Sequence, residues 1–517
     1  MHSKSPAPCL AVLGTGSDVG KSIVVTAMCR CLANNGIRVA PFKAQNMSNN
    51  SGVTPEGQEM GRAQIVQAEA CRIPPHVDMN PILLKPTSDV GAQVVLLGEA
   101  LANQTAREYH QQKELLFSAA CQALDRLRNS FDLVIIEGAG SCAEVNLMAH
   151  DIVNFRIAAY ADAPVILVGD IHRGGIFAQL VGTLACLPAD AQERIAGFII
   201  NRFRGDISLF QDGARWIESR TDKTVFGVLP WLNNLEVEAE DSVVIENLKA
   251  PISGKDVRPA IAVIRIPHIS NFTDFDPLAR ISEIAVCFIE HPQDMTGYHA
   301  VIIPGSKNTC FDLRWLHDSG WARLIRSYAA GGGHVLGICG GYQMLGMQVQ
   351  DPEGLEGSPG ETPGLGLLSI ETVLKAPKTT TLSTFEWQGI SGAGYEIHMG
   401  QTRLLDDRPL LTITRRNGCA CKEADGAISA RHSVMGTYLH GLFDTPDIIR
   451  LWLNSIGLVN IHISGENGPA ERDAAYNRLA AHFEAHVNMP AILIPFCFQN
   501  DIPASIRTET AKASEQR

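Results

Sequence analysis

A glycine-rich segment near the N-terminus has the residue types and spacing of a phosphate-binding loop. Residues 14–22 read GTGSDVGKS and follow an apolar run at 9–13. Glycines let backbone N–H groups close around phosphate oxygens, and the N-terminus of a following helix adds partial positive charge. Lys21 is therefore expected on the β- and γ-phosphates of ATP, and the Ser22 hydroxyl on Mg²⁺. The predicted ATP-binding residues are Gly14, Thr15, Gly16, Gly20, Lys21 and Ser22.

Polar side chains also follow the other apolar runs of the N-terminal half. Glu137 comes directly after the run 133–136, and Asp170 follows the run 165–168. Ligand-handling residues gather at the carboxyl edge of open α/β sheets, so either carboxylate could hold Mg²⁺ beside Ser22. Asp170 is equally suited to capping a turn. Guanidinium and ammonium groups pair with phosphate and carboxylate, and the candidate substrate-binding residues in similar positions are Lys43, Asn46, Arg202 and Arg204.

A second chemical site is indicated by a cysteine between an apolar run and a predicted helix. Residues 337–346 read GICGGYQMLG, so Cys339 occupies a nucleophile elbow whose flanking glycines permit a strained turn. A helix N-terminus favours the thiolate, which can attack the γ-carboxamide of glutamine and release ammonia. Taken alone, a buried cysteine is more often inert.

The predicted thiol nucleophile needs a base and an oxyanion site. His440 ends the run 436–439 and is followed by glycine, so it is the predicted base although it is far from Cys339 in sequence. The backbone N–H groups of Gly305 and Gly340 are expected to form the oxyanion hole. A lone histidine is more often structural, and the combination of elbow, glycine loop and histidine is what favours catalysis.

Apolar runs that alternate with helical stretches must position these residues. In the N-terminal half the runs lie at 9–13, 38–42, 133–136, 165–168, 198–200 and 225–229. Such runs are typical of parallel strands covered on both faces, and their alternation with helices predicts a doubly wound α/β layer. A second α/β series has strands at 261–266, 301–304 and 334–338, and the pattern after about residue 365 indicates short strands and turns.

With 517 residues, the chain is too long for one core, so more than one domain is expected. We predict one domain at 1–246, which carries the phosphate-binding loop, and a second at 261–490, which carries the thiol site. The linker between them, 247–260, contains two prolines, a Ser-Gly pair and mixed charges. Residues 473–486 predict a surface helix, and residues 491–517 a flexible tail.

Composition disfavours several classes of partner. The net charge is −12 and no Lys/Arg run is present, which argues against nucleic acid or an anionic membrane. The 13 cysteines are scattered through apolar segments, as expected for free thiols in a reducing cytoplasm. No apolar run reaches the roughly 18 residues of a membrane span.

Together these motifs resemble a known family. Residues 337–346 and 436–443 are similar to a class I glutamine amidotransferase domain. The N-terminal half is similar to a dethiobiotin-synthetase-type ATP domain, in which five residues rather than four precede the Gly-Lys pair. That fusion is found in cobyric acid synthase and in cobyrinic acid a,c-diamide synthase. Similarity to cobyric acid synthase runs from about residue 10 to 486 and is carried by segments 41–47, 61–64, 77–81, 84–86, 170–175, 199–206, 270–278 and 394–400.

The resemblance implies a glutamine-hydrolysing ligase of cobalamin biosynthesis, with a P-loop ATP-dependent amide-forming domain at 1–246 and a glutamine amidotransferase domain at 261–490. Its substrate would be adenosylcobyrinic acid a,c-diamide, of which four peripheral carboxylates become carboxamides with one ATP and one glutamine each. ATP would phosphorylate the carboxylate, and ammonia would displace the phosphate, with Mg²⁺ as cofactor. Ammonia is mostly protonated at neutral pH, so a shielded route between the two sites is expected.

One departure from the wider amidotransferase pattern leaves a question open. Many members carry His-x-Glu, whose carboxylate orients the imidazole, but Leu442 occupies that position here. Two alternative functions also remain. Cobyrinic acid a,c-diamide synthase amidates only two carboxylates, and a P-loop partitioning or metal-delivery ATPase has no need of Cys339 and His440.

Overall fold

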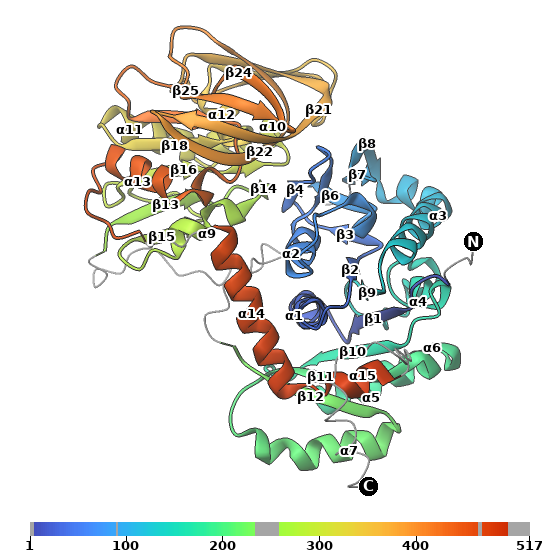
Figure 1. Cartoon of the computed structure of the whole chain (residues 1–517). Coiled ribbons are helices and arrows are strands. Elements are labelled where there is room, and N and C mark those ends of the chain that lie inside the picture. The colour runs from blue at the N-terminus through green and yellow to red at the C-terminus, as the bar shows by residue number, and fades with distance from the viewer. Residues whose placement is uncertain (1–4, 89–90, 233–257, 464–467, 495–517) are drawn as a thin grey trace.

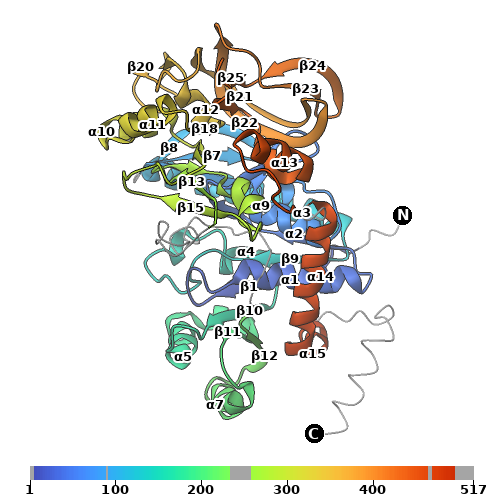
Figure 2. The same ribbon diagram turned by 90° about the vertical axis from the view of Figure 1, so that its left-hand side faces the viewer.

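The computed structural model describes residues 5–88, 91–232, 258–463 and 468–494. Two α/β bodies pack against each other, one built mainly from the N-terminal half and the other from residues 258–463 (Figure 1, Figure 2). Residues 247–257 of the predicted linker and 495–517 of the predicted tail lie outside the described residues. The last predicted linker residue, Ala260, already belongs to strand β13 (Ala260–Ile264).

The N-terminal body is built on a six-stranded sheet whose neighbouring strands are all parallel. The central strands are fully buried, as expected for a sheet covered on both faces. All six predicted strands form, and their order is β12 (Thr224–Pro230), β11 (Ile195–Phe203), β10 (Val165–Asp170), β1 (Cys9–Gly14), β9 (Leu133–Glu137) and β2 (Val39–Phe42).

Helices cover both faces of this sheet, so the fold is doubly wound. One face is covered by α1 (Lys21–Asn34) and part of α2 (Arg62–Ala70). The opposite face is covered by α3 (Ala106–Ser130), α4 (Phe155–Tyr160), α5 (Ile176–Cys186), α6 (Ala189–Arg194) and α7 (Gln211–Thr221). Short 3-10 helices are η1 (Val77–Met79), η2 (Met148–His150) and η3 (Ile207–Phe210). None of the helices in the described part of the chain combines the length and apolar character of a membrane span.

Between β2 and α3 the chain makes an excursion that the sequence pattern did not predict. It forms a four-stranded sheet in the order β3 (Gln45–Met47), β6 (Ile82–Ser88), β7 (Gly91–Leu96) and β8 (Glu99–Thr105). It also forms a hairpin of β4 (Ser51–Val53) and β5 (Glu59–Gly61). Strand β4 contacts strands of the second body, so this excursion carries N-terminal residues to the interface (Figure 1).

The C-terminal body contains a second six-stranded sheet, parallel except for its last strand. Its order is β15 (Ala285–Ile289), β13, β16 (Ala300–Ile303), β18 (His334–Ile338), β26 (Val434–Thr437) and β25 (Ala427–Ile428). Helices α10 (Thr309–Asp318), α11 (Trp321–Ala330) and α12 (Gly340–Leu345) cover one face, and α9 (Asp276–Ala279) and α13 (Pro446–Ser455) the other. The short elements are β14 (Ile269–Ser270), β17 (Gly305–Ser306), η4 (Phe272–Phe275) and η5 (Leu442–Asp444).

The region after residue 365 differs from the expected short strands and turns. It contains two long paired strands, β21 (Ile370–Trp387) and β22 (Ile390–Leu404). Many residues of these strands are partly exposed and polar, so the long strands lack the apolar runs that mark a buried strand. The other strands of this sheet, in which only the β19–β21 pair is parallel, are β19 (Gln348–Asp351), β20 (Gly360–Pro363), β23 (Leu411–Arg416) and β24 (Cys419–Asp425).

The last helices return to the N-terminal body. The predicted surface helix is α14 (Pro469–His486), which runs from the C-terminal body down to α1 (Figure 1). Its apolar face, Tyr476, Leu479, Ala480 and Phe483, is buried in the N-terminal core. Helix α15 (Met489–Leu493) packs there too, so residues 491–493 of the predicted tail are helical. One face of α14 is therefore buried and the other faces solvent, because its apolar residues recur at a spacing of three and four.

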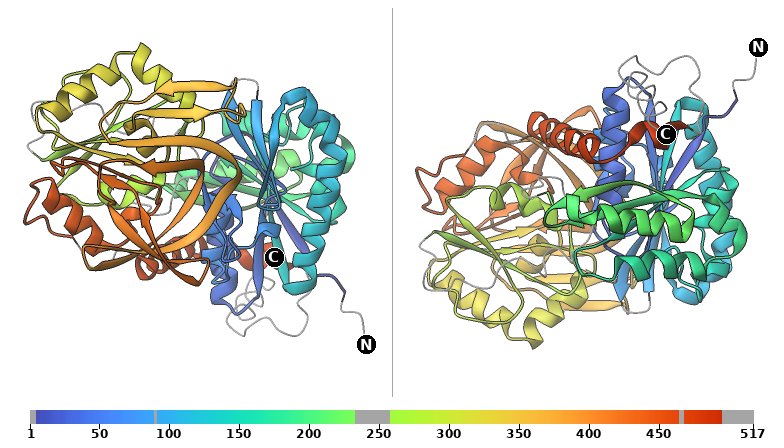
Figure 3. Two further views of the ribbon diagram at one scale, coloured as in Figure 1. Left: turned by 90° about the horizontal axis from the view of Figure 1, so that it is seen from above. Right: turned by 90° about the horizontal axis from the view of Figure 1, so that it is seen from below.

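The two bodies lie side by side (Figure 3), and both buried polar groups and apolar side chains join them. The Asn271 side chain donates a 2.8 Å hydrogen bond to the carbonyl of Ser51 in β4. Val53 of the same strand packs against Tyr395 and Ile397 of β22. The β4–β5 hairpin is therefore seated on the C-terminal body.

Candidate active sites

The glycine-rich loop joins β1 to α1, with Gly20 at a φ of 91° immediately before the helix. This left-handed conformation favours glycine. The Lys21 ammonium donates to the carbonyl oxygens of Gly16 at 3.0 Å and Gly140 at 2.8 Å. The lysine is thus folded back over the loop, a position from which it can reach phosphate oxygens.

A buried polar cluster surrounds Glu137 at the carboxyl end of β9. The Ser22 hydroxyl donates to Glu137 Oε1 at 2.8 Å, and the Lys43 ammonium lies 2.9 Å from the same oxygen. The Gln67 amide donates to the other oxygen. The Ser22 hydroxyl and the Glu137 carboxylate lie side by side and offer the oxygen ligands that Mg²⁺ prefers. These two residues therefore fit a magnesium site.

Asp170, the other predicted metal ligand, has different partners. Its carboxylate accepts a hydrogen bond from the backbone N–H of His172 and pairs with Arg202 at 2.9 Å. Arg202 also pairs with Asp18 of the glycine-rich loop at 3.0 Å. The geometry therefore places Asp170 with a guanidinium and a turn, whereas Glu137 is the carboxylate that contacts Ser22.

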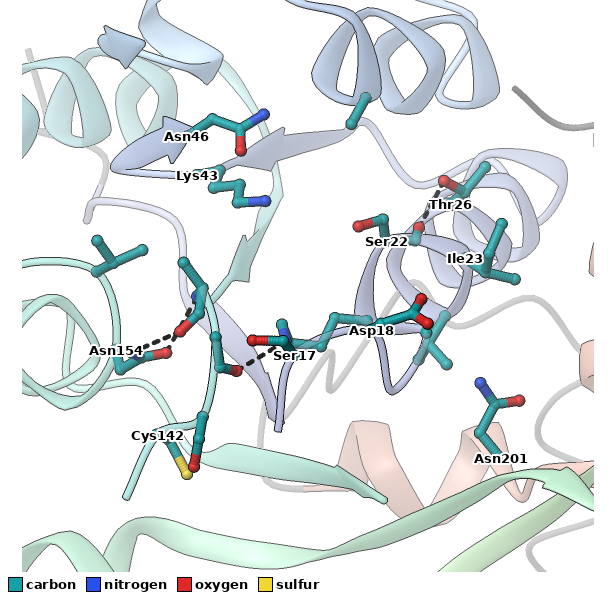
Figure 4. A pocket seen from close by; sticks show the side chains of 18 of the residues that line it. Ser17, Asp18, Ser22, Ile23, Thr26, Lys43, Asn46, Cys142, Asn154 and Asn201 are labelled. Atoms are coloured by element: carbon teal, nitrogen blue, oxygen red, sulfur yellow. Dashed lines mark hydrogen bonds between the residues drawn. The ribbon is translucent and has the colours of Figure 1, made fainter. Parts of the chain in front are cut away.

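A cavity of about 1410 Å³ opens beside this loop. In Figure 4 Ser22 and Lys43 point toward one another across it, with Asn46 beside Lys43. Predicted residues that line it are Gly20, Lys21, Ser22, Lys43, Asn46 and Arg202. Arg204 instead stacks over the Trp231 ring at 4.1 Å. Helix α14 contributes Leu479, His482 and Phe483 to the wall, which the sequence did not predict.

The predicted thiol elbow forms between β18 and α12. Cys339 has φ 52° and ψ −107°, a strained conformation for a residue other than glycine. Its backbone N–H donates to the Thr437 carbonyl at 2.8 Å, which ties the elbow to β26. Such strain is stored where the surrounding structure fixes a side chain for chemistry.

Cys339 and His440 line one small cavity although 101 residues separate them in sequence. His440 Nδ1 lies 2.7 Å from Asp274 Oδ2, and Asp274 Oδ1 accepts the Gly441 N–H at 2.9 Å. Burial alone would lower the pKa of His440, but the Asp274 carboxylate and the Cys339 thiol raise it to about 10. The site thus favours an imidazolium beside the thiol.

Asp274 is placed to orient the imidazole as the carboxylate of a His-x-Glu motif would, and the sequence did not predict it. The residue lies in η4, inside the segment 270–278 that carried part of the family resemblance. That resemblance was the available signal, but nothing in the spacing connects Asp274 to a histidine 166 residues away.

The two glycines predicted for the oxyanion hole both lie so close to neighbouring residues that a side chain would not fit. A Cβ on Gly305 would lie 3.0 Å from the His440 ring, and one on Gly340 would lie 2.8 Å from the Ser306 backbone nitrogen. Side chains are thus excluded from both positions beside the thiol. Donation of their N–H groups to an oxyanion stays a prediction.

Comparison with known proteins gives matches along almost the whole chain. Residues 10–244 match the CobQ/CobB/MinD/ParA nucleotide binding domain, and residues 260–448 match the CobB/CobQ-like glutamine amidotransferase domain. A cobyric acid synthase of Chlorobium phaeobacteroides (strain BS1) is 52% identical over 93% of this chain and 97% of its own length. Cobyric acid synthases of Chlorobaculum tepidum and Vibrio parahaemolyticus are 49% and 44% identical, covering 93% and 94% of this chain and 96% and 99% of their own lengths.

Proposed function

The chain belongs to the cobyric acid synthase family, whose members are glutamine-hydrolysing ligases of cobalamin biosynthesis, and from this we propose that it converts adenosylcobyrinic acid a,c-diamide to adenosylcobyric acid. In that reaction four peripheral carboxylates become carboxamides, each at the expense of one ATP and one glutamine. The observation that carries the proposal is the pairing, in one chain, of a nucleotide-type cavity with a thiol–imidazole site.

At the first site the substrate carboxylate is activated. Lys21 and the backbone of its loop hold the β- and γ-phosphates, and Ser22 and Glu137 would hold Mg²⁺, which neutralises phosphate charge when bound. A carboxylate oxygen attacks the γ-phosphorus, and ADP leaves. Ammonia then attacks the acyl carbon of the mixed anhydride and displaces phosphate. Lys43 lines the same cavity, where its ammonium group is paired with Glu137.

At the second site ammonia is released from glutamine. The Cys339 thiolate attacks the γ-carboxamide carbon, and the His440 imidazolium gives its proton to the departing nitrogen. Ammonia leaves and a glutamyl thioester remains. His440, now neutral, takes a proton from water, which hydrolyses the thioester to glutamate. Asp274 holds the imidazole in the orientation that these transfers need.

Mass spectrometry of the product tests the proposal. The enzyme is incubated with adenosylcobyrinic acid a,c-diamide, ATP, Mg²⁺ and glutamine labelled with ¹⁵N in its amide. Four incorporated labels are expected. Labelling of cobyrinic acid at two positions, with no reaction of the a,c-diamide, would instead identify a cobyrinic acid a,c-diamide synthase. ATP hydrolysis without any label in a corrin would contradict both assignments.

A further inference from the structure

The cavity at Cys339 is bordered by three lysines that come from both bodies. Lys85 belongs to β6 of the N-terminal body, whereas Lys307 follows β17 and Lys378 lies in β21. The glutaminase mechanism described above uses none of them. Three ammonium groups around a cavity of about 40 Å³ need anionic partners.

Two of the three ammonium groups are neutralised by one buried carboxylate. Glu59 of the β4–β5 hairpin, 1% exposed, pairs with Lys85 at 2.6 Å through one oxygen and with Lys378 at 2.6 Å through the other. Lys85 also donates to the Ser51 hydroxyl at 2.8 Å. Both oxygens of Glu59 are therefore engaged by these two cations, and neither forms an ion pair with Lys307 in the part of the chain that the structure describes.

Lys307 is the third cation at this cavity, and it is not paired with Glu59. Within the described residues its ammonium group makes no hydrogen bond or ion pair, although it is only partly exposed and lines the cavity. Burial, reinforced by the ammonium groups of Lys378 and Lys85, lowers the pKa of Lys307 to about 7, although the carboxylates of Glu356 and Glu59 oppose this shift. An anion bound here would restore the charged form.

A second unsatisfied group marks the same cavity as a place for a polar ligand. Gln343 is 2% exposed, and its Oε1 has no hydrogen-bond partner among the described residues. Glu356 also lines the cavity, so an acceptor and a carboxylate stand near the unpaired ammonium group. A ligand that carries both an anionic and a cationic group would satisfy this set of side chains.

We propose that Lys307 binds the α-carboxylate of glutamine, with the Glu59-paired Lys85 of the N-terminal body completing the wall of that subsite. The inference rests on the proposed role of Cys339 at the carboxamide end of the same molecule. Glutamine is larger than the cavity, which holds a few water molecules. The unpaired Lys307 side chain can move to admit it because no ion pair has to break.

The glutamine subsite is consequently shared between the bodies. Strand β17, which precedes Lys307, lies against the elbow at Gly340, so the carboxylate and carboxamide subsites are built on neighbouring residues. Lys85 and Glu59 reach this wall from the ATP-binding half. The wall of the glutamine subsite is therefore complete only where the two bodies are assembled.

The test compares Lys307→Met with the wild-type enzyme on two amide donors, glutamine and 4-aminobutanamide, which lacks the α-carboxylate. Charge-assisted hydrogen bonds of this kind correspond to about 10- to 100-fold in kcat/KM. The kcat/KM of the wild type should therefore be higher for glutamine than for 4-aminobutanamide by at least about 10- to 100-fold. In Lys307→Met the preference should fall by the same 10- to 100-fold, while ammonium-driven amidation is retained.

Two control variants make the result specific. Lys375→Met, at an exposed position on the same strand as Lys378, should keep the wild-type preference. Lys307→Arg should recover much of it, because the cation is retained. An unchanged preference in Lys307→Met, or an equal loss with ammonium, overturns the proposed subsite. Full glutamine-dependent activity in Cys339→Ala would instead overturn the proposed function, so the two failures are distinguishable.

Discussion

Replacement of Asp274 by asparagine removes the charge that orients His440 while keeping the shape of the side chain. Asp274 and His440 are 4% and 1% exposed, so water cannot replace the charged acceptor that lies 2.7 Å from His440 Nδ1. A hydrogen bond to a charged group contributes about 1.5–3 kcal/mol. Since each ~1.4 kcal/mol corresponds to a factor of ten, we expect kcat/KM for glutamine to fall about 10- to 100-fold.

The same substitution should move the pH profile. In the native site the carboxylate and the thiol outweigh burial and raise the pKa of His440 to about 10, so the imidazolium persists through neutral pH. Without the Asp274 charge the pKa of His440 falls, and the protonated form is lost at a lower pH. The alkaline limb of glutamine-dependent activity should therefore shift to lower pH, whereas ammonium-dependent activity should not show this shift.

The assay measures glutamate release across a pH series, in parallel with amidation driven by ammonium. Asp318→Asn, at an exposed position at the end of α10, is the matched control and should behave as wild type. The reasoning is refuted if Asp274→Asn retains the wild-type pH profile and kcat/KM. It is equally refuted if the variant loses both nitrogen sources to the same extent, which would indicate a structural role.

Four further outcomes follow from the geometry. Cys339→Ala should lose glutamine-dependent amidation but keep activity with high ammonium at alkaline pH, as followed by product mass. Lys21→Ala should abolish amidation with either nitrogen source, and near wild-type turnover with ammonium would contradict the ATP site. Glu137→Gln should sharply raise the Mg²⁺ concentration needed for half-maximal rate, and an unchanged requirement would move the metal elsewhere. Glu59→Gln leaves buried ammonium groups without a counter-charge and should lower the free energy of unfolding, measured in urea, by about 3–5 kcal/mol. Burial alone would raise the pKa of Glu59, but Lys378 and Lys85 outweigh it and hold this pKa well below its ordinary range. The stabilisation that Glu59 gives the wild type is therefore present above pH 4.5 and is lost as the pH falls further.

The features that the sequence predicted well are encoded locally. The glycine-rich loop and the cysteine elbow are each set by a few consecutive residues, whose glycines permit left-handed or crowded backbone. The six N-terminal strands were predicted because a parallel sheet covered on both faces needs continuous apolar runs. The placement of Glu137 beside Ser22 followed from the shared carboxyl edge of that sheet.

The features that were missed depend on pairing between distant segments. Asp274 reaches His440 from η4, a four-residue 3-10 helix with no periodic signal. Strands β4 and β5 have three residues each, too few to show an alternation, yet they bring Glu59 to the second body. The apolar spacing on α14 could have indicated a buried face, but nothing in the chain tells which body that face covers.

The return of α14 to α1 fixes an order of events during synthesis. The Cys31 thiol in α1 donates to the Ala480 carbonyl in α14 across 449 residues of sequence. At about 5–20 residues per second, the ribosome needs roughly 20–90 s to make the helix that covers this face. Throughout that interval the apolar side of α1 faces solvent or a chaperone. The N-terminal body is therefore begun first and completed only after the rest of the amidotransferase body has been made.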